Sequence, residues 1–158
     1  MKEKQIRAKR KVVVLKGQVA SSKNNKQIRF NKYTRQTYLT ASDYAQEYIE
    51  SLYPQIVENR DKFLKLLEGK EPPYRIEMKF YRKDHGVFDY HNLCQAVLDC
   101  ITGKVYFPRP RNKRMGEIYN RERDKIKWLE DDNMNWIIPV FVPYEVDKDD
   151  PRVEIRVL

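Results

Sequence analysis

The sequence predicts an α+β fold in which helices cover a mixed β-sheet within a single domain. The chain has 158 residues, enough for one domain with a sizeable hydrophobic core. Residues 74–81 alternate apolar and polar side chains, which is the pattern of a half-buried strand. Residues 40–67 instead repeat apolar side chains at helical spacing. These two patterns in one short chain indicate that both kinds of structure share the domain.

The first expected elements are short strands. Residues 11–17 contain a β-branched run that ends at Gly17, and they predict a first strand. A polar, turn-forming loop at 21–26 then leads into a short strand or hairpin around residues 27–30.

Two helices are expected next. Residues 40–42 offer an N-cap for a helix that runs to Tyr53, where Pro54 breaks or kinks it. A second helix is expected at 56–67, ending before Gly69. The apolar face of the first helix comprises Tyr44, Ala45, Tyr48, Ile49 and Leu52, and that of the second comprises Val57, Phe63, Leu64 and Leu67.

The second half of the chain predicts one more helix and two strands. After the strand at 74–81, a helix is expected from about 91 to 101. Residues 104–127 lack periodicity and contain two prolines, so we expect a mobile basic insertion there. The last two strands are expected at 136–142 and 153–157.

Positive charge is concentrated in two segments of this chain, whose formal net charge is +9. Residues 1–11 carry six basic side chains and one acidic one, and residues 104–127 carry nine basic and three acidic ones. The rest of the chain therefore has a net charge of −2. Such basic patches attract polyanions, although an ordinary solvated surface also explains them.

The composition also bears on the compartment. No apolar run approaches the roughly 18 residues of a membrane span, and the N-terminus does not have the pattern of a signal peptide. Cys94 and Cys100 lie six residues apart without a zinc-binding pattern, so we expect two reduced thiols that serve packing. These observations predict a cytoplasmic protein with no membrane partner.

Acidic residues and a histidine gather in the middle of the chain, at Asp89 and His91, and a second acidic group follows about forty residues later at Asp131 and Asp132. Acids inside a basic protein suit a metal-dependent enzyme that acts on nucleic acid. A metal ion held by carboxylates lowers the pKa of bound water and neutralises phosphate oxygens. Because Asp131 and Asp132 are adjacent, we expect only one of them to point into a site if the backbone is extended, and we favour Asp132.

The same residues carry a resemblance to a known family. The chain reads Asp89-Tyr90-His91-Asn92-Leu93, continues with Ala96 and Asp99, and then has Gly103 and the pair Asp131-Asp132. This order is similar to the pattern Asp-x-Asp-Asn-Leu, x-Lys-Ala-x-x-Asp-x-Leu, Gly and Asp-Asp of the RusA family of phage and prophage Holliday junction resolvases. The resemblance spans residues 11–158.

The resemblance implies a fold, an activity and partners. Residues 11–158 would form a RusA-like nuclease domain with a basic insertion at 104–127, preceded by a basic tail at 1–10. A homodimer would bind four-way DNA junctions and cut them symmetrically with a divalent metal, Mg²⁺, during recombination and repair. The protein would act in the cytoplasm of a bacterial host and be encoded by a phage or prophage.

The resemblance also implies roles for single residues. It gives catalytic roles to Asp89, His91 and Asp132, and metal binding to these three and Asp131. Alternatives exist for each: Asp89 is also a favoured N-cap, the Asp pair also suits a surface turn, and His91 is also explained as a partly buried residue near the cap. Asp99 is expected to give structural support, since an acid among apolar neighbours needs a hydrogen-bonding partner.

Two residues depart from the family pattern. His91 replaces an aspartate, which makes Mn²⁺ an alternative to Mg²⁺ because imidazole suits transition metals better. Gln95 replaces a lysine, so a cation is missing near the expected scissile phosphate. A catalytically degraded DNA-binding protein is therefore the main alternative, and an interaction domain without a nucleic-acid role is a third.

Basic side chains beside aromatic ones predict the DNA contacts. Tyr106 and Phe107 lie among basic residues and offer surfaces on which bases can stack. The predicted phosphate contacts are Lys23, Lys26, Lys104, Arg109, Arg111, Lys113 and Arg114. Such contacts position a protein on DNA but do not select a sequence.

Overall fold

The computed structural model describes residues 11–20, 26–107 and 109–158. A mixed sheet is built around the long strand β4, which pairs antiparallel with β7 on one side and parallel with β5 and β6 on the other, while β1 pairs antiparallel with the far side of β7. These strands are β1 (Val13–Lys16), β4 (Tyr74–Arg82), β5 (Ile137–Phe141), β6 (Glu145–Val146) and β7 (Arg152–Val157). The predicted α+β class with a mixed sheet is confirmed.

Alternation along the central strands creates the core face of the sheet. Ile76, Met78 and Phe80 of β4 are buried, whereas the residues between them are partly exposed. Across the sheet, Met78 lies opposite Ile155 and Phe80 lies opposite Val153, both fully buried in β7. Burial of such side chains stabilises the fold by about 25 cal/mol per Å² of apolar surface removed from water. The helices therefore pack against this face of the sheet.

Helix α1 (Asp43–Leu67) is one continuous helix of 25 residues, so the expectation of two helices separated at Pro54 is wrong. Ser42 is its N-cap, as expected, and its Oγ accepts a hydrogen bond from the Ala45 N–H at 3.3 Å. Leu52 and Ile56 are fully buried on either side of Pro54. Their packing keeps the helix intact, because tertiary contacts can outweigh the cost of a proline. Val57, expected on the apolar face, is 48% exposed.

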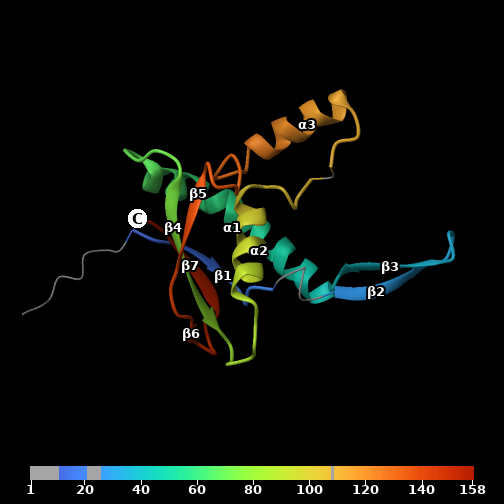
Figure 1. The fold of residues 1–158 in the computed structure, drawn as a ribbon, viewed down its shortest axis with the longest axis horizontal. Helices are drawn as coiled ribbons and strands as arrows, with labels where there is room; N and C mark the ends of the chain where they lie inside the picture. The colour runs from blue at the N-terminus through green and yellow to red at the C-terminus, as the bar shows by residue number, and fades with distance from the viewer. Residues whose placement is uncertain (1–10, 21–25, 108) are drawn as a thin grey trace, which may run out of the picture.

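Helix α2 (Tyr90–Ile101) packs beside α1, which contacts β1 and β7 directly, and α2 buries most of its residues (Figure 1). Thr102 is its C-cap, and Gly103 follows with a φ of 74°, a conformation that glycine adopts at no steric cost. Both cysteines lie buried on this helix as free thiols, and burial raises the pKa of Cys94 to about 11 and that of Cys100 to about 12. The expected packing role of the cysteines is confirmed.

Helix α3 (Lys113–Asp124) lies inside the segment 104–127, where we expect no regular element, so that expectation is wrong for these residues, while their mobility stays a prediction. Asn112 caps the helix, and its side-chain oxygen accepts from the Met115 N–H at 2.9 Å. No residue of α3 is buried. Its mean hydropathy is low, so the helical period is hard to see in the sequence.

The chain returns to the core after α3. Trp128 is buried, donates from Nε1 to the Ile56 carbonyl at 2.8 Å, and stacks on Phe63 with ring centroids 4.8 Å apart. The Trp128 N–H also donates to the carbonyl of Ile101, the last residue of α2, at 2.7 Å, which places the following residues beside the end of α2.

A separate hairpin is formed by β2 (Lys26–Asn31) and β3 (Gln36–Ala41). It projects away from the sheet and from α2, starting beside the first turn of α1 (Figure 1). Within the residues that the structure describes, no helix is long and apolar enough to cross a membrane.

Candidate functional site

Gln95 connects helix α2 to the acidic pair. Its Nε2 donates hydrogen bonds to Asp99 Oδ1 at 2.7 Å and to Asp132 Oδ2 at 2.5 Å. Gln95 and Asp99 lie one turn apart on the same face of α2, and both are half-buried. The support that we expected from Asp99 is therefore present in the structure, and it reaches Asp132 through Gln95.

Lys104 lies between the two adjacent aspartates. Its Nζ forms ion pairs with Oδ1 of Asp131 and with Oδ1 of Asp132. The Asp132 side chain is only 16% exposed, whereas those of Lys104 and Asp131 are 36% and 38% exposed. Two carboxylates thus share one ammonium group at the edge of the protein.

The pKa values of Asp131 and Lys104 shift in opposite directions. Hydrogen bonds from Lys104, and then those involving Asp132, hold the pKa of Asp131 well below its usual range. Partial burial opposes the charge of Lys104, but the hydrogen bonds to Asp131 and Asp132 outweigh burial and raise its pKa. Lys104 and Asp131 are therefore charged at neutral pH, so the Lys104 ammonium is a built-in counter-ion of this site.

A turn brings both aspartates to the same side. Asp131 Oδ1 accepts from the Asp132 N–H at 2.8 Å, and Asp131 Oδ2 accepts from Asn133 Nδ2 at 2.9 Å. The Asn133 carbonyl accepts from the N–H groups of Trp136 and Ile137, where β5 begins. The expectation that only one aspartate faces the site holds for an extended backbone, whereas the chain bends here and both carboxylates reach Lys104.

Asp89 lies at the other end of α2. It is the exposed N-cap of the helix, and its Oδ1 accepts from the Asn92 N–H at 3.3 Å. Six residues separate it from Gln95, which corresponds to about 9 Å along the helix axis. The capping role is confirmed, and the metal-binding role of Asp89 stays a prediction.

His91 belongs to the same stripe of α2 as Gln95, one turn closer to the N-terminus. It is exposed, so the interpretation as a partly buried histidine is wrong. Its ring lies edge-on to Phe141 of β5, with centroids 5.2 Å apart and an interplanar angle of 89°. His91, Gln95 and Asp99 thus form a polar line along α2 that leads toward the Asp pair.

The carboxylates fit a divalent cation by their chemistry. Asp131 and Asp132 already converge on one cation, the ammonium of Lys104, and carboxylate oxygens are the ligands that Mg²⁺ and Mn²⁺ accept. In residues 11–20, 26–107 and 109–158, no group of three or more His, Cys, Asp or Glu side chains is placed to hold a metal ion.

The predicted DNA contacts have different surroundings. Four are exposed: Arg109, Arg111, Lys113 and Arg114. Lys26 is also exposed, at the start of β2, whereas Lys104 pairs with the aspartates. Lys23 and the tail at 1–10 lie outside the described residues.

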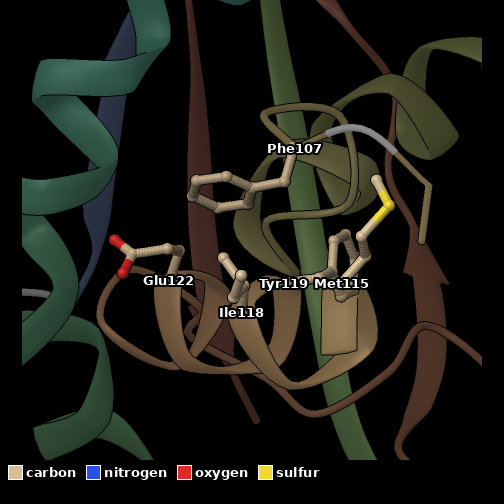
Figure 2. Close-up of a pocket in the computed structure, with 5 residues that line it drawn as sticks. All are labelled: Phe107, Met115, Ile118, Tyr119 and Glu122. Atoms are coloured by element: carbon tan, nitrogen blue, oxygen red, sulfur yellow. The ribbon is translucent and has the colours of Figure 1, made fainter. Parts of the chain in front are cut away.

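An apolar pocket lies between the loop after α2 and helix α3. Figure 2 shows the Phe107 ring facing the side chains of α3. The cavity has a volume of about 170 Å³ and is lined by Phe107, Met115, Ile118, Tyr119 and Glu122. The rings of Phe107 and Tyr119 are edge-on, with centroids 6.2 Å apart. Tyr106 instead turns toward α1, where its hydroxyl donates to the Ile49 carbonyl at 2.9 Å.

Sequence reasoning missed two residues of this site. Gln95 was interpreted only as a lost lysine and Lys104 only as a phosphate contact, although together they engage both aspartates. The signal available in the sequence was the helical spacing of Gln95 and Asp99. Neither the family models nor the curated proteins include a match to this chain.

Proposed function

We propose that this protein is a RusA-like, metal-dependent endodeoxyribonuclease that resolves four-way DNA junctions. The observation that carries the proposal is the pair Asp131–Asp132, which is tied to α2 through Gln95 and shares one cation. The pair lies on a chain with a net charge of +9. Acids that concentrate cations, on a protein that attracts polyanions, suit hydrolysis of a phosphodiester.

Lys104 supplies the cation that the family pattern has at the position of Gln95. Its ammonium contacts both aspartates directly. Gln95 donates to Asp132 from a neutral amide, where the lysine of the family pattern would donate from a charged ammonium group. When DNA binds, Lys104 can move from the carboxylates to the phosphate, since both are oxygen anions of similar hydrogen-bonding geometry.

The predicted metal ligands are Asp89, His91, Asp131 and Asp132. A divalent cation bound there would acidify a water molecule and neutralise charge on the phosphate. Asp131 and Asp132 share the Lys104 ammonium from the loop before β5, whereas Asp89 is the N-cap of α2 and His91 lies in its first turn. The four side chains would have to draw together around the ion, since no three of them are placed to hold it in the described residues. Mg²⁺ is the expected ion, and His91 makes Mn²⁺ the alternative.

The partner that we propose is branched DNA. Arg109, Arg111, Lys113 and Arg114 are exposed and would contact phosphates, and Phe107 offers an apolar surface beside them. A homodimer follows from the need for two symmetric cuts. We place the protein in the cytoplasm of a bacterial host, in recombination and repair, with a phage or prophage origin.

One observation favours a second function, that of a DNA-binding protein without cleavage. Lys104 occupies the Asp pair, and Gln95 and His91 depart from the family pattern. A descendant that lost its metal would keep the basic surface and gain stability from such an internal ion pair.

Cleavage of a synthetic four-way junction separates the two functions. The wild type is compared with Asp132→Asn on the junction and on linear duplex, in Mg²⁺, in Mn²⁺ and in EDTA. We expect metal-dependent cuts on the junction alone, lost in the variant. Tight binding to the junction without cuts in either metal would leave the second function, and equal weak binding to junction and duplex would contradict both.

A further inference from the structure

The β2–β3 hairpin exposes an apolar face that nothing in the described residues covers. Ile28 lies opposite Leu39 and Phe30 lies opposite Thr37, so these side chains share one face of the ribbon. Ile28 is 74% exposed, Leu39 60% and Phe30 57%. A solvated two-stranded hairpin is marginally stable alone, so these exposures indicate an interaction surface.

The charge of the hairpin selects the kind of partner. Residues 26–41 contain Lys26, Arg29, Lys32 and Arg35 and no acidic residue. Tyr33, at the tip, is 99% exposed. Two copies of such an arm would repel each other, whereas a polyanion is attracted to it.

The hairpin is organised before any partner binds. At its root, Asp43 in the first turn of α1 accepts from Arg29 at 2.5 Å and from Gln27 at 3.0 Å. At its tip, Asn31 Oδ1 accepts from the backbone N–H groups of Tyr33 at 2.9 Å and Thr34 at 3.2 Å. An arm held at both ends loses little conformational entropy on binding.

The dimensions of the ribbon suit a DNA groove. Its strands have six residues each, about 20 Å in length, and a strand pair is about 5 Å apart in backbone spacing. The major groove of duplex DNA is about 12 Å wide and admits a two-stranded ribbon. Apolar side chains can contact thymine methyl groups there while basic ones reach phosphates.

We propose that the β2–β3 hairpin is a DNA-binding arm that lies in the groove of one duplex arm of the substrate. The inference that the partner is DNA rests on the proposed function, but not on cleavage. The arm adds Lys32, Tyr33 and Arg35 to the predicted DNA contacts. Among the contacts predicted from the sequence, only Lys26 belongs to this hairpin. Lys32 and Arg35 at the tip contact phosphate, and Tyr33 reaches beyond them.

The test compares two variants that lose the same charge. Lys32→Gln with Arg35→Gln changes the tip, and Lys62→Gln with Lys65→Gln changes exposed residues on α1. Binding to a four-way junction and to linear duplex is measured in EDTA over a salt series. We expect the tip variant to bind about tenfold more weakly, with the salt dependence reduced by about two phosphate contacts. The α1 variant should match the wild type.

Equal losses of DNA affinity in the tip variant and the α1 variant would overturn the proposal, because the loss of two positive charges would then explain both. A third variant, Ile28→Thr with Leu39→Thr, tests the competing occupant by sedimentation. If it dissociates a wild-type oligomer and keeps DNA affinity, the arm binds a second copy and the proposal is wrong. Binding is measured in EDTA, where metal-dependent cleavage cannot occur, so the two proposals are tested separately. A protein that binds DNA through the arm but does not cut in Mg²⁺ or Mn²⁺ would contradict the proposed nuclease activity and leave the DNA-binding arm supported.

Discussion

Lys104 Nζ pairs with Asp132 Oδ1 across 28 residues of sequence and connects the end of helix α2 to the loop before strand β5. The same ammonium also pairs with Asp131. Asp132 in turn accepts from Gln95 at 2.5 Å. The aspartate pair is therefore held from two places on or just after α2, and removing either contact should change its behaviour.

Replacing Lys104 with alanine should leave two neighbouring carboxylates without their counter-ion. We expect the free energy of unfolding to fall by about 1 kcal/mol in EDTA at low salt. Millimolar Mg²⁺ should restore most of it if the pair binds a divalent cation. Urea denaturation with and without Mg²⁺ measures both effects, and Lys125→Ala, at the C-cap of α3, is the control. A loss that Mg²⁺ leaves unchanged would argue against a metal at this pair.

Replacing Pro54 with alanine should stabilise the protein. Pro54 is exposed in the middle of α1 and provides no N–H for the helical hydrogen bond to the carbonyl four residues earlier. We expect the free energy of unfolding to rise by about 1–3 kcal/mol, as measured by urea denaturation. Pro143→Ala, in a loop, should change it little. A destabilised Pro54→Ala would show that α1 needs the proline to keep its path across the core.

Replacing Trp128 with phenylalanine should destabilise the link between α1 and the Asp pair. The variant keeps a ring against Phe63 but loses the donor to the Ile56 carbonyl. We expect a cost of about 1–2 kcal/mol, and about 3–5 kcal/mol for Trp128→Ala. Thermal and urea unfolding provide the values. If Trp128→Phe were as stable as the wild type, the indole hydrogen bond would have no net effect.

The stability of the protein should depend on pH through Asp147. The hydrogen bond from Arg152, at 2.8 Å, lowers the pKa of Asp147 below its ordinary value. A lowered pKa in the folded state stabilises the protein above the unfolded pKa of about 3.9, and this contribution is lost as pH falls toward the folded value. Asp147→Asn should thus be less stable than the wild type near pH 7.

The difference between Asp147→Asn and the wild type should shrink as the pH falls through about 4. Urea denaturation at a series of pH values measures this difference, with Asp149→Asn as the matched control. A difference that stays constant down to low pH would mean that the Asp147 charge does not contribute. Arg152 also stacks on the Tyr81 ring at 3.7 Å, so its position survives the substitution.

Most elements of the fold could be predicted because their signals are local. The alternation at 74–81 appears as β4, and the cap at Ser42 and the apolar face of 91–101 appear as α1 and α2. Two predictions failed, and packing decided only the first of them. Pro54 does not divide α1 because Leu52 and Ile56 are buried around it, and α3 forms without burying any residue.

The candidate site was only partly predictable. The sequence singled out Asp131 and Asp132, and the structure joins them through a shared cation. It did not identify Gln95 as their neighbour, 37 residues away from Asp132, because contacts between distant polar groups leave no periodic pattern.

By itself, the sequence determined the type and position of most helices and strands, the uneven charge and the two acidic groups, since each follows from neighbouring residues and their spacing. Only the tertiary structure decided which polar groups meet. Packing of α2 beside α1, and of Trp128 against α1 and the end of α2, brings Gln95 and Lys104 to the aspartate pair. Such contacts depend on the geometry of the whole core, which no short stretch of the chain encodes.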